Sequence, residues 1–225
     1  MSLLADIVAS KRREIEALKA RGKDVARKAA PLRGPLEARP RLDVVGALRR
    51  PVGAPLRLVT EVKLRSPSAG ALSRAMTPDA RAAAYASGGA AMVSVLCDGP
   101  FFDGAWEHLE AARARVERTP LLAKEFVLDA AQIVEARARG GDAVLLIARI
   151  VDRATLASLA RAARDEGIEP LVEVVDEGEL DAALAAGARL VGVNARDLDT
   201  LAMDAARTAR VLDAIPASVV AVHFS

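Results

Sequence analysis

Short apolar runs alternate with alanine-rich, amphipathic segments along most of the chain. Seven apolar runs rich in β-branched residues predict strands, at residues 56–62, 91–96, 121–127, 143–147, 170–175, 190–193 and 219–222. Six segments with helical periodicity lie between them, at residues 78–87, 106–115, 130–139, 153–166, 177–186 and 204–212. A strand followed by a helix, repeated many times, predicts a parallel sheet with helices packed against it.

The chain before residue 50 has a different pattern. Apolar residues within 3–19 fall on one helical stripe and predict an amphipathic helix. Lys11 interrupts that stripe, and we expect its stem to lie along apolar surface with the amine in water. We therefore expect an N-terminal extension over residues 1–50, which carries this extra helix, followed by a single barrel domain over residues 56–225.

Polar residues at the ends of the predicted strands distinguish between two architectures for such a sheet. A doubly wound, dinucleotide-binding sheet calls for a G-x-G-x-x-G turn after its first strand, and this sequence has SPSAG at 66–70 instead. Charged or amide side chains stand at the C-terminal ends of several strands: Glu61, Lys63, Lys124, Glu173 and Asn194. A barrel brings these ends to one mouth, where such residues are typical of catalysis. The sequence therefore favours a barrel.

Composition and charge narrow the function classes. The 225 residues include 32 lysines and arginines and 30 acidic residues, and a net charge of +2 argues against a nucleic-acid binder that depends on a basic face. A single cysteine excludes a disulfide framework and fits a reducing compartment. No apolar run approaches the roughly 18 residues that span a bilayer. We expect a cytoplasmic protein without a nucleic-acid or membrane partner.

Lysine is scarce beyond the N-terminal region. Only Lys63 and Lys124 follow Lys28, and arginine supplies every other positive charge after it. Chance in an arginine-favouring genome would also give this pattern. Lysine differs from arginine, however, in having an amine whose pKa the surroundings can lower. The retention of these two lysines indicates that the chemistry needs an amine.

The predicted barrel mouth offers acids and bases. Glu61 and Lys63 are two residues apart on a strand, so they share a face, either as a structural ion pair or as part of a site. Lys124 is expected to share a small cavity with Lys63, and the like charge to lower the pKa of its amine toward the range of a general acid. Glu173 lies in an otherwise apolar strand, where it is either a core partner for the lysines or a general base.

Further polar residues suit an anionic substrate. Asn194 and Arg196 end a strand with an amide and a fork-shaped cation, although Arg196 fits a solvated loop equally well. Ser66 offers its hydroxyl to a phosphate or belongs to an ordinary turn. Cysteine and histidine form no cluster that suggests a metal.

Four segments resemble the signature motifs of the indole-3-glycerol phosphate synthase family. They read EVKLRSPSAG at 61–70, LLAKEF at 121–126, LVEV at 171–174 and VGVNARDL at 191–198. The N-terminal helix resembles the extra helix that this family places before its barrel. The resemblance implies a TIM barrel of the (β/α)8 type and a carbon–carbon lyase of tryptophan biosynthesis that needs no metal or cofactor.

The resemblance also implies a substrate and a role for each candidate residue. The substrate is 1-(2-carboxyphenylamino)-1-deoxyribulose 5-phosphate, which closes to indole-3-glycerol phosphate with loss of carbon dioxide and water. The implied catalytic residues are Lys124 as general acid, Lys63 as partner of the substrate carboxylate, Glu173 as base and Glu61 as the residue that orients the lysines. The implied substrate-binding residues are Ser66, Phe102, Phe126, Asn194, Arg196, Leu198 and Ser225.

The sequence departs from the family pattern in two ways. The family usually has Glu-Ser-Gly at the end of its seventh strand. This chain has His223-Phe224-Ser225 there, and Phe224 stands where a carboxylate is expected, so that group is missing or moved. The predicted elements also stop at seven strands and lack the eighth strand–helix unit of a closed barrel. We expect either a truncated form of a longer polypeptide or a barrel completed in another way. An open edge predicts poor stability in isolation, or a homodimer or partner that covers it.

Two other functions compete with the lyase. Another phosphate-binding barrel, such as a phosphoribosyl-amine isomerase, does not call for two lysines and two glutamates at the mouth. A catalytically impaired or non-catalytic remnant, which binds a phosphorylated metabolite or assembles with a partner, agrees with the missing eighth unit. It gives no reason, however, to keep lysine at positions 63 and 124 while arginine is used elsewhere. The sequence therefore favours the enzyme.

Overall fold

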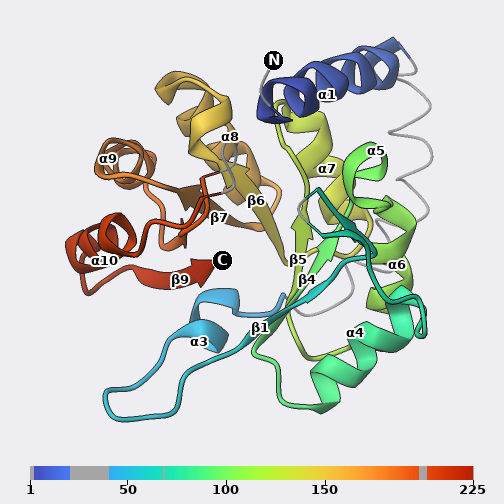
Figure 1. Cartoon of the computed structure of the whole chain (residues 1–225), viewed down its shortest axis with the longest axis horizontal. Coiled ribbons are helices and arrows are strands. Elements are labelled where there is room, and N and C mark those ends of the chain that lie inside the picture. Colours follow the sequence, from blue (N-terminus) through green and yellow to red (C-terminus); the bar gives the residue numbers. More distant parts are fainter. Residues whose placement is uncertain (1–2, 21–40, 68, 198–201, 225) are drawn as a thin grey trace.

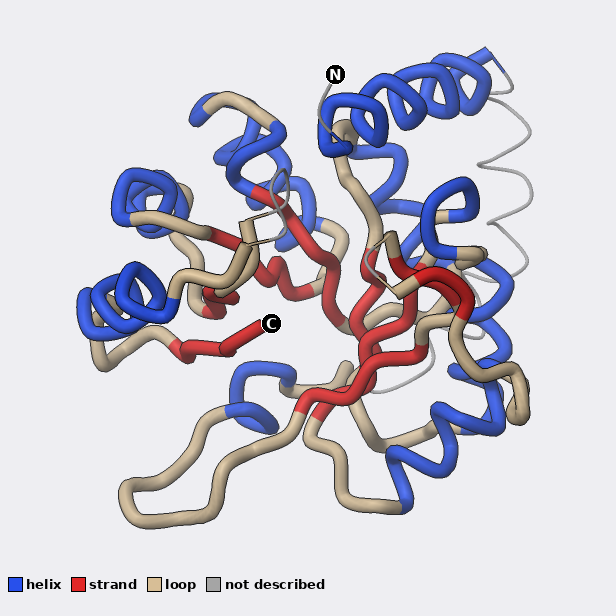
Figure 2. Tube along the Cα trace, viewed as in Figure 1, coloured by secondary structure: helices blue, strands red, loops and turns tan. Residues whose placement is uncertain are grey.

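A computed structural model describes residues 3–20, 41–67, 69–197 and 202–224 of the chain. Within them, seven parallel strands follow one another in chain order around a curled sheet (Figure 1). The strands are β1 (Val59–Val62), β4 (Met92–Leu96), β5 (Leu121–Lys124), β6 (Ala143–Ile147), β7 (Glu169–Val174), β8 (Leu190–Asn194) and β9 (Val220–Phe224). In the described ranges β1 and β9 are the two edges of this sheet, and the curl is open between them (Figure 2). The fold is therefore of the predicted barrel type, with seven strands in place.

Helices cover the outer face of the sheet, as the alternating pattern predicts (Figure 2). They are α4 (Pro78–Ser87), α6 (Trp106–Arg115), α7 (Ala130–Ala138), α8 (Arg153–Asp165), α9 (Glu177–Ala185) and α10 (Ala205–Ala214). Four of them begin after an aspartate whose side chain accepts a backbone N–H of the first turn: Asp129, Asp152, Asp176 and Asp204. No helix in the described parts of the chain has both the length and the apolarity needed to cross a bilayer.

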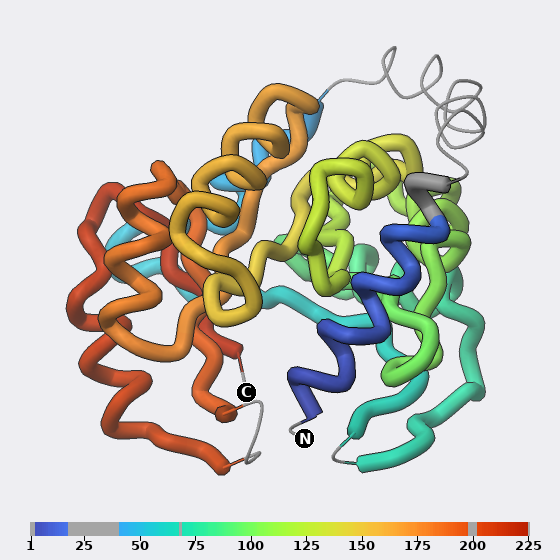
Figure 3. The backbone as a smooth tube through the Cα atoms, turned by 90° about the horizontal axis from the view of Figure 1, so that it is seen from above, coloured from blue at the N-terminus to red at the C-terminus, as the bar shows by residue number. Residues whose placement is uncertain are grey.

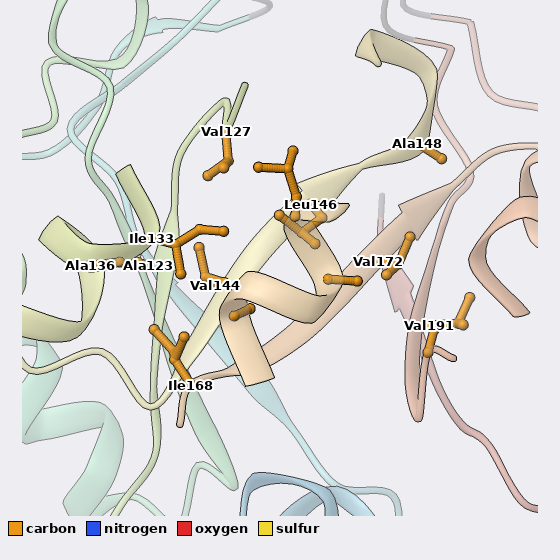
Figure 4. Close-up of a cluster of buried hydrophobic side chains, with 14 of the residues drawn as sticks. Ala123, Val127, Ile133, Ala136, Val144, Leu146, Ala148, Ile168, Val172 and Val191 are labelled. Carbon is orange, nitrogen blue, oxygen red and sulfur yellow. The ribbon is translucent and has the colours of Figure 1, made fainter. Parts of the chain in front are cut away.

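Alternate residues of the strands build two apolar layers. The outer layer packs the sheet against the helices, and in it Val144 and Leu146 of β6 lie near Ile133 of α7 (Figure 4). The inner layer fills the barrel interior and includes Leu145 of β6 and Leu171 of β7. Successive side chains of a strand point to opposite faces, so β6 is buried on both sides and has a continuous apolar sequence.

Two helices of the N-terminal extension lie at the two ends of the barrel interior. Helix α1 (Leu3–Ala20) crosses the end at which the strands terminate, outside the ring of the other helices, and inserts Ile7 into the inner layer (Figure 3). Helix α3 (Val44–Leu48) lies at the opposite end, near the opening between β1 and β9 (Figure 1). Just after α3, the Nη2 of Arg49 donates a hydrogen bond to the carbonyl oxygen of Ser218, 2.9 Å away, and so ties this helix to the start of β9.

Short elements in the loops were not predicted. A two-stranded antiparallel hairpin, β2 (Arg65–Ser66) with β3 (Gly70–Ala71), follows β1. Helix α5 (Gly99–Phe102) follows β4, and the 3₁₀ helix η1 (Ala148–Ile150) follows β6. Each follows the C-terminal end of a barrel strand and shapes the mouth of the barrel. None is long enough to show a helical or strand periodicity in the sequence.

The expectation that the amine of Lys11 lies in water is wrong. Lys11 is 1% exposed, and its ammonium forms ion pairs with Glu14, Asp98 and Glu125. An ammonium can be buried when carboxylates surround it, and the two buried carboxylates come from segments distant in sequence. The inward face of α1 therefore consists of apolar side chains and one buried, ion-paired lysine.

A second buried ion pair lies at the opposite end of the sheet. The guanidinium of Arg113, in α6, pairs with the carboxylate of Asp142 and donates to the carbonyl oxygens of Gly140 and Val116. The Asp142 carboxylate also accepts the backbone N–H of Leu121 at 2.9 Å, the first residue of β5. The pair thus links a helix to the starts of two neighbouring strands.

We expect Arg113→Met to lower the free energy of unfolding by about 3–5 kcal/mol, because it leaves Asp142 buried without its cation. Urea unfolding followed by circular dichroism measures the change. The matched control is Arg115→Met on the same helix, which removes a solvent-exposed ion pair with Asp79 and should change the stability much less. Equal losses in the two variants would contradict this role of Arg113.

Candidate active site

The C-terminal ends of the strands surround a cavity of about 540 Å³. Every described residue of the predicted site lines it: Glu61, Lys63, Ser66, Phe102, Lys124, Phe126, Glu173, Asn194 and Arg196. Leu198 and Ser225, also predicted to bind substrate, lie outside the described residues. The barrel therefore brings together residues that are spread over most of the sequence, as the mouth of such a barrel does.

The register of the strands explains why these side chains meet. Neighbouring residues across a parallel pair share a face, and Glu61 is paired with Ser94, whereas Lys124 is paired with Leu96, two residues further along the same strand. On the other side of the barrel, Asn194 is paired with Phe224. All these positions have the parity of the inner layer, so their side chains point into the cavity.

Glu61 lies between two ammonium groups. One of its carboxylate oxygens pairs with the Nζ of Lys63, and the other accepts a hydrogen bond from the Nζ of Lys124 at 2.7 Å. Burial works to raise the pKa of Glu61, but the charges and hydrogen bonds of Lys124 and Lys63 outweigh it and lower this pKa. Glu61 is thus a stable anion that is bonded to both lysines.

The pKa of Lys124 departs from the sequence expectation. We expected the like charge of Lys63 to lower it, and this expectation is wrong. Burial does lower the pKa of this amine, but attraction by Glu61 and Glu173 and the hydrogen bond to Glu61 raise it overall. Lys124 is therefore a charged ammonium at neutral pH, and it holds its proton more tightly than a free lysine does. The next residue, Glu125, pairs with Lys11 instead.

Glu173 is a buried carboxyl group of the site, with 3% of its surface exposed. One of its oxygens accepts a hydrogen bond from the Nδ2 of Asn194 at 2.9 Å. Burial raises the pKa of Glu173, and the opposing effects of the Lys124 charge and the Asn194 hydrogen bond do not cancel it. A carboxylate with a raised pKa is a stronger base than a free glutamate. Glu173 can therefore accept a proton from a bound molecule.

Aromatic side chains form part of the cavity wall. The ring centroids of Phe102 and Phe126 are 5.9 Å apart, and the ring of Phe224 has the Nζ of Lys124 5.1 Å from its centroid. The Phe224 ring also lies against Gly192 of β8, where a Cβ would come within 2.3 Å of a ring carbon. Phe224 therefore fills the space over the glycine and contacts the same ammonium that Glu61 holds.

Sequence reasoning missed part of the wall and its support. Leu145 and Ile147 of β6 line the cavity, as do Leu3, Leu4 and Ile7 of α1. The sequence could not show which residues of β6 point inward, because a strand buried on both faces is apolar throughout and gives no sign of its inner face.

The loop after β1 is held by Arg81 of α4. Its Nη1 donates to the carbonyl oxygen of Lys63 at 3.1 Å. The hydroxyl of Ser66 accepts the N–H of Ala69 at 3.1 Å, which closes the turn of the hairpin. Both interpretations of Ser66 therefore have support, because it belongs to a turn and also lines the cavity. Among the residues described, no group of three or more His, Cys, Asp or Glu side chains is arranged to hold a metal ion.

Comparison with known proteins places these features in a family. The sequence pattern of indole-3-glycerol phosphate synthase matches residues 4–225. Indole-3-glycerol phosphate synthase 1 of Streptomyces coelicolor is 45% identical over 186 residues, which cover 83% of this chain and 68% of that protein. The synthase of Roseiflexus sp. is 42% identical over 96% of this chain and 80% of its own length. For the synthase of Mycobacterium ulcerans the identity is 45% over 81% of this chain, and the match spans 66% of the relative.

Proposed function

The chain belongs to the indole-3-glycerol phosphate synthase family, and we propose that its cavity catalyses the reaction for which that family is named. The substrate is 1-(2-carboxyphenylamino)-1-deoxyribulose 5-phosphate, and the product is indole-3-glycerol phosphate. The observation that carries the proposal is the linked set Lys63–Glu61–Lys124, with buried Glu173 in the same cavity. This set places a proton donor and a proton acceptor around one site.

The first step of the proposed reaction forms a carbon–carbon bond. The ring carbon that carries the carboxylate attacks the ribulose carbonyl carbon. The ammonium of Lys124 donates its proton to the carbonyl oxygen, which becomes a hydroxyl group. The raised pKa of Lys124 keeps this donor protonated before the attack. The C–CO₂ bond then breaks, carbon dioxide leaves, and its bonding electrons restore the aromatic ring.

The second step is a dehydration. The new hydroxyl group leaves as water with a proton supplied by an ammonium of the site, and Glu173 accepts the proton that the substrate loses as the indole double bond forms. Lys63 holds the substrate carboxylate until it leaves as carbon dioxide. Glu61 keeps both ammonium groups in place, because it is bonded to each of them.

The remaining cavity residues are proposed to bind the ends of the substrate. Asn194 positions the sugar hydroxyl groups, and Ser66 and Arg196 lie toward the phosphate or the anthranilate end. Phe102 and Phe126 receive the aromatic ring, for which their close contact provides an apolar wall. Leu198 is proposed to line the pocket of the aromatic ring, and Ser225 is proposed to bind the substrate. The Phe224 side chain stands where the family usually has a carboxylate, and we propose that the reaction proceeds without that group at a reduced rate.

The organisation of the whole chain is also a proposal. We propose that residues 56–225 form one barrel domain, with residues 1–50 as its extension. The apolar side chains of Leu56 and Leu58, just before β1, are largely exposed. Their exposure supports a second copy of the chain or another polypeptide as a cover for the edge between β1 and β9. A cytoplasmic location fits a small phosphorylated substrate and the free, buried thiol of Cys97.

The experiment that tests the proposed function is a turnover assay with the purified chain. We expect the substrate to give a product with indole fluorescence, and no added metal or cofactor to be required. A chain that isomerises a phosphoribosyl-amine instead, or that binds the substrate without converting it, would support one of the two competing functions.

A further inference from the structure

Lys11 forms a buried charge cluster beneath helix α1. Its Nζ is 2.8 Å from an oxygen of Glu14, 2.9 Å from Asp98 and 3.0 Å from Glu125. Asp98 and Glu125 are almost completely buried, and Glu14 is half-exposed on the same helix as Lys11. Lys11 itself does not line the cavity. Any influence that it has on a bound substrate must therefore pass through its partners.

The two buried partners each hold a segment that carries one of the cavity's aromatic rings. Asp98 caps helix α5: its second carboxylate oxygen accepts the backbone N–H of Phe101 at 2.9 Å, and the next residue is Phe102. Glu125 accepts the backbone N–H of Phe126 at 2.8 Å. One ammonium thus joins the segments that present Phe102 and Phe126 to each other.

The electrostatics show why this cluster depends on Lys11. Burial lowers the pKa of the Lys11 amine, but the surrounding carboxylates raise it well above its ordinary value, so the group is charged. Burial raises the pKa of Glu125 to about 7, although Lys11 and the N–H of Phe126 act to lower it. Without Lys11, two buried carboxyl groups would lie side by side with no cation between them.

The same ammonium fastens α1 to the barrel mouth. Leu3, Leu4 and Ile7 of this helix line the cavity together with Phe102 and Phe126. Lys11 is one turn beyond Ile7 on the inward side of the helix, so its ion pairs fix the position of that apolar wall as well.

We propose that Lys11 is a positioning residue for substrate recognition, which holds α1, α5 and the segment after β5 in the arrangement that receives the aromatic ring of the substrate. The inference rests on the proposed function for the identity of that ring. Under this proposal, Lys11 contributes to substrate binding and takes part in no proton transfer. Lys11 should therefore affect the affinity for the substrate more than the rate of its conversion.

The test compares Lys11→Met with Arg13→Met, which removes an exposed cation from the same helix. We expect Lys11→Met to raise KM about tenfold or more with kcat changed less than about threefold, since a loss of binding shared by ground and transition states changes KM alone. The dissociation constant of a substrate analogue whose ribulose carbonyl is reduced to an alcohol should rise by the same factor. Arg13→Met should leave all three quantities unchanged.

A double variant guards against simple misfolding. Lys11→Met with Glu125→Gln removes one of the stranded carboxylates, and we expect it to recover thermal stability without recovering affinity for the analogue. Hydrogen exchange of the Phe101 and Phe126 amides provides a readout independent of the reaction. Both amides should exchange at least tenfold faster in Lys11→Met than in the unmodified chain, because the carboxylates that accept them are no longer held.

These readouts separate the two claims. If the unmodified chain shows no turnover, the proposed function fails, and the exchange rates of the two amides still decide the role of Lys11. Unchanged exchange rates would overturn the inference. A folded variant with unchanged affinity, or a loss confined to kcat, would overturn it as well.

Discussion

Lys124→Met is expected to lower kcat by about a thousandfold or more while the substrate analogue still binds. Methionine keeps the stem of the side chain and removes the ammonium that donates to Glu61 from 2.7 Å. Glu61 retains Lys63 as its ion-pair partner in this variant, and Glu173, which loses the nearby charge of Lys124, keeps its hydrogen bond from Asn194. The loss should therefore reflect the missing proton donor and not a collapse of the site. Single-turnover and steady-state indole fluorescence measure it.

Lys63→Met is the matched comparison for this prediction. It removes the other ammonium bound to Glu61 and leaves Lys124 in place. Because Lys63 is assigned to the substrate carboxylate, we expect its loss to raise KM by more than it lowers kcat. If Lys124→Met retained kcat within about tenfold of the unmodified chain, the general acid would have to be another residue.

Glu173→Gln is expected to lower kcat about a hundredfold or more and to change the pH dependence of the reaction. Glutamine preserves the volume of the side chain and can still contact Asn194, but it cannot accept a proton. The assigned base must be unprotonated to act. Activity of the unmodified chain should thus fall as the pH drops through the pKa of Glu173, which is raised above 4.5. Lys124 must be protonated, and its pKa is raised above 10.5, so activity persists through neutral pH.

The pH profile of kcat for the two proteins measures this effect. The acid limb should be present in the unmodified chain and absent from Glu173→Gln, whose residual activity should be flat from the acid side to neutrality. An acid limb that stays at the same pH in the variant would assign it to a different group, and Glu173 would then be a structural partner of Lys124.

Local sequence patterns were sufficient to predict the barrel strands, the helices between them and the general fold, although β1 and β5 are shorter than the predicted runs 56–62 and 121–127. The bounds of α4 and α6 are those predicted, because each begins and ends at a clear change of periodicity. The barrel followed from polar residues at the strand ends, and the described members of that set line one cavity. Family resemblance supplied the substrate, which no periodicity could give.

What the sequence did not predict depends on contacts between distant segments. In the sequence, Lys11 only interrupts an apolar stripe. Its carboxylate partners, Asp98 and Glu125, are distant along the chain and meet its amine only in the folded protein. The pKa of Lys124 was judged from Lys63 alone, but Glu61 lies between the two ammonium groups and reverses the direction. Both errors arise because the charge of each lysine was considered without knowing where its carboxylate partners lie in the fold.

The central claim is that this chain converts the carboxyphenylamino-deoxyribulose phosphate with Lys124 as the proton donor. The most direct measurement follows indole fluorescence and carbon dioxide release together, for the unmodified chain and for Lys124→Met. We predict that the unmodified chain forms product and carbon dioxide in equal amounts, and that both disappear almost completely in the variant. Binding of the substrate by the unmodified chain with no release of either would contradict the claim and indicate a non-catalytic binding protein.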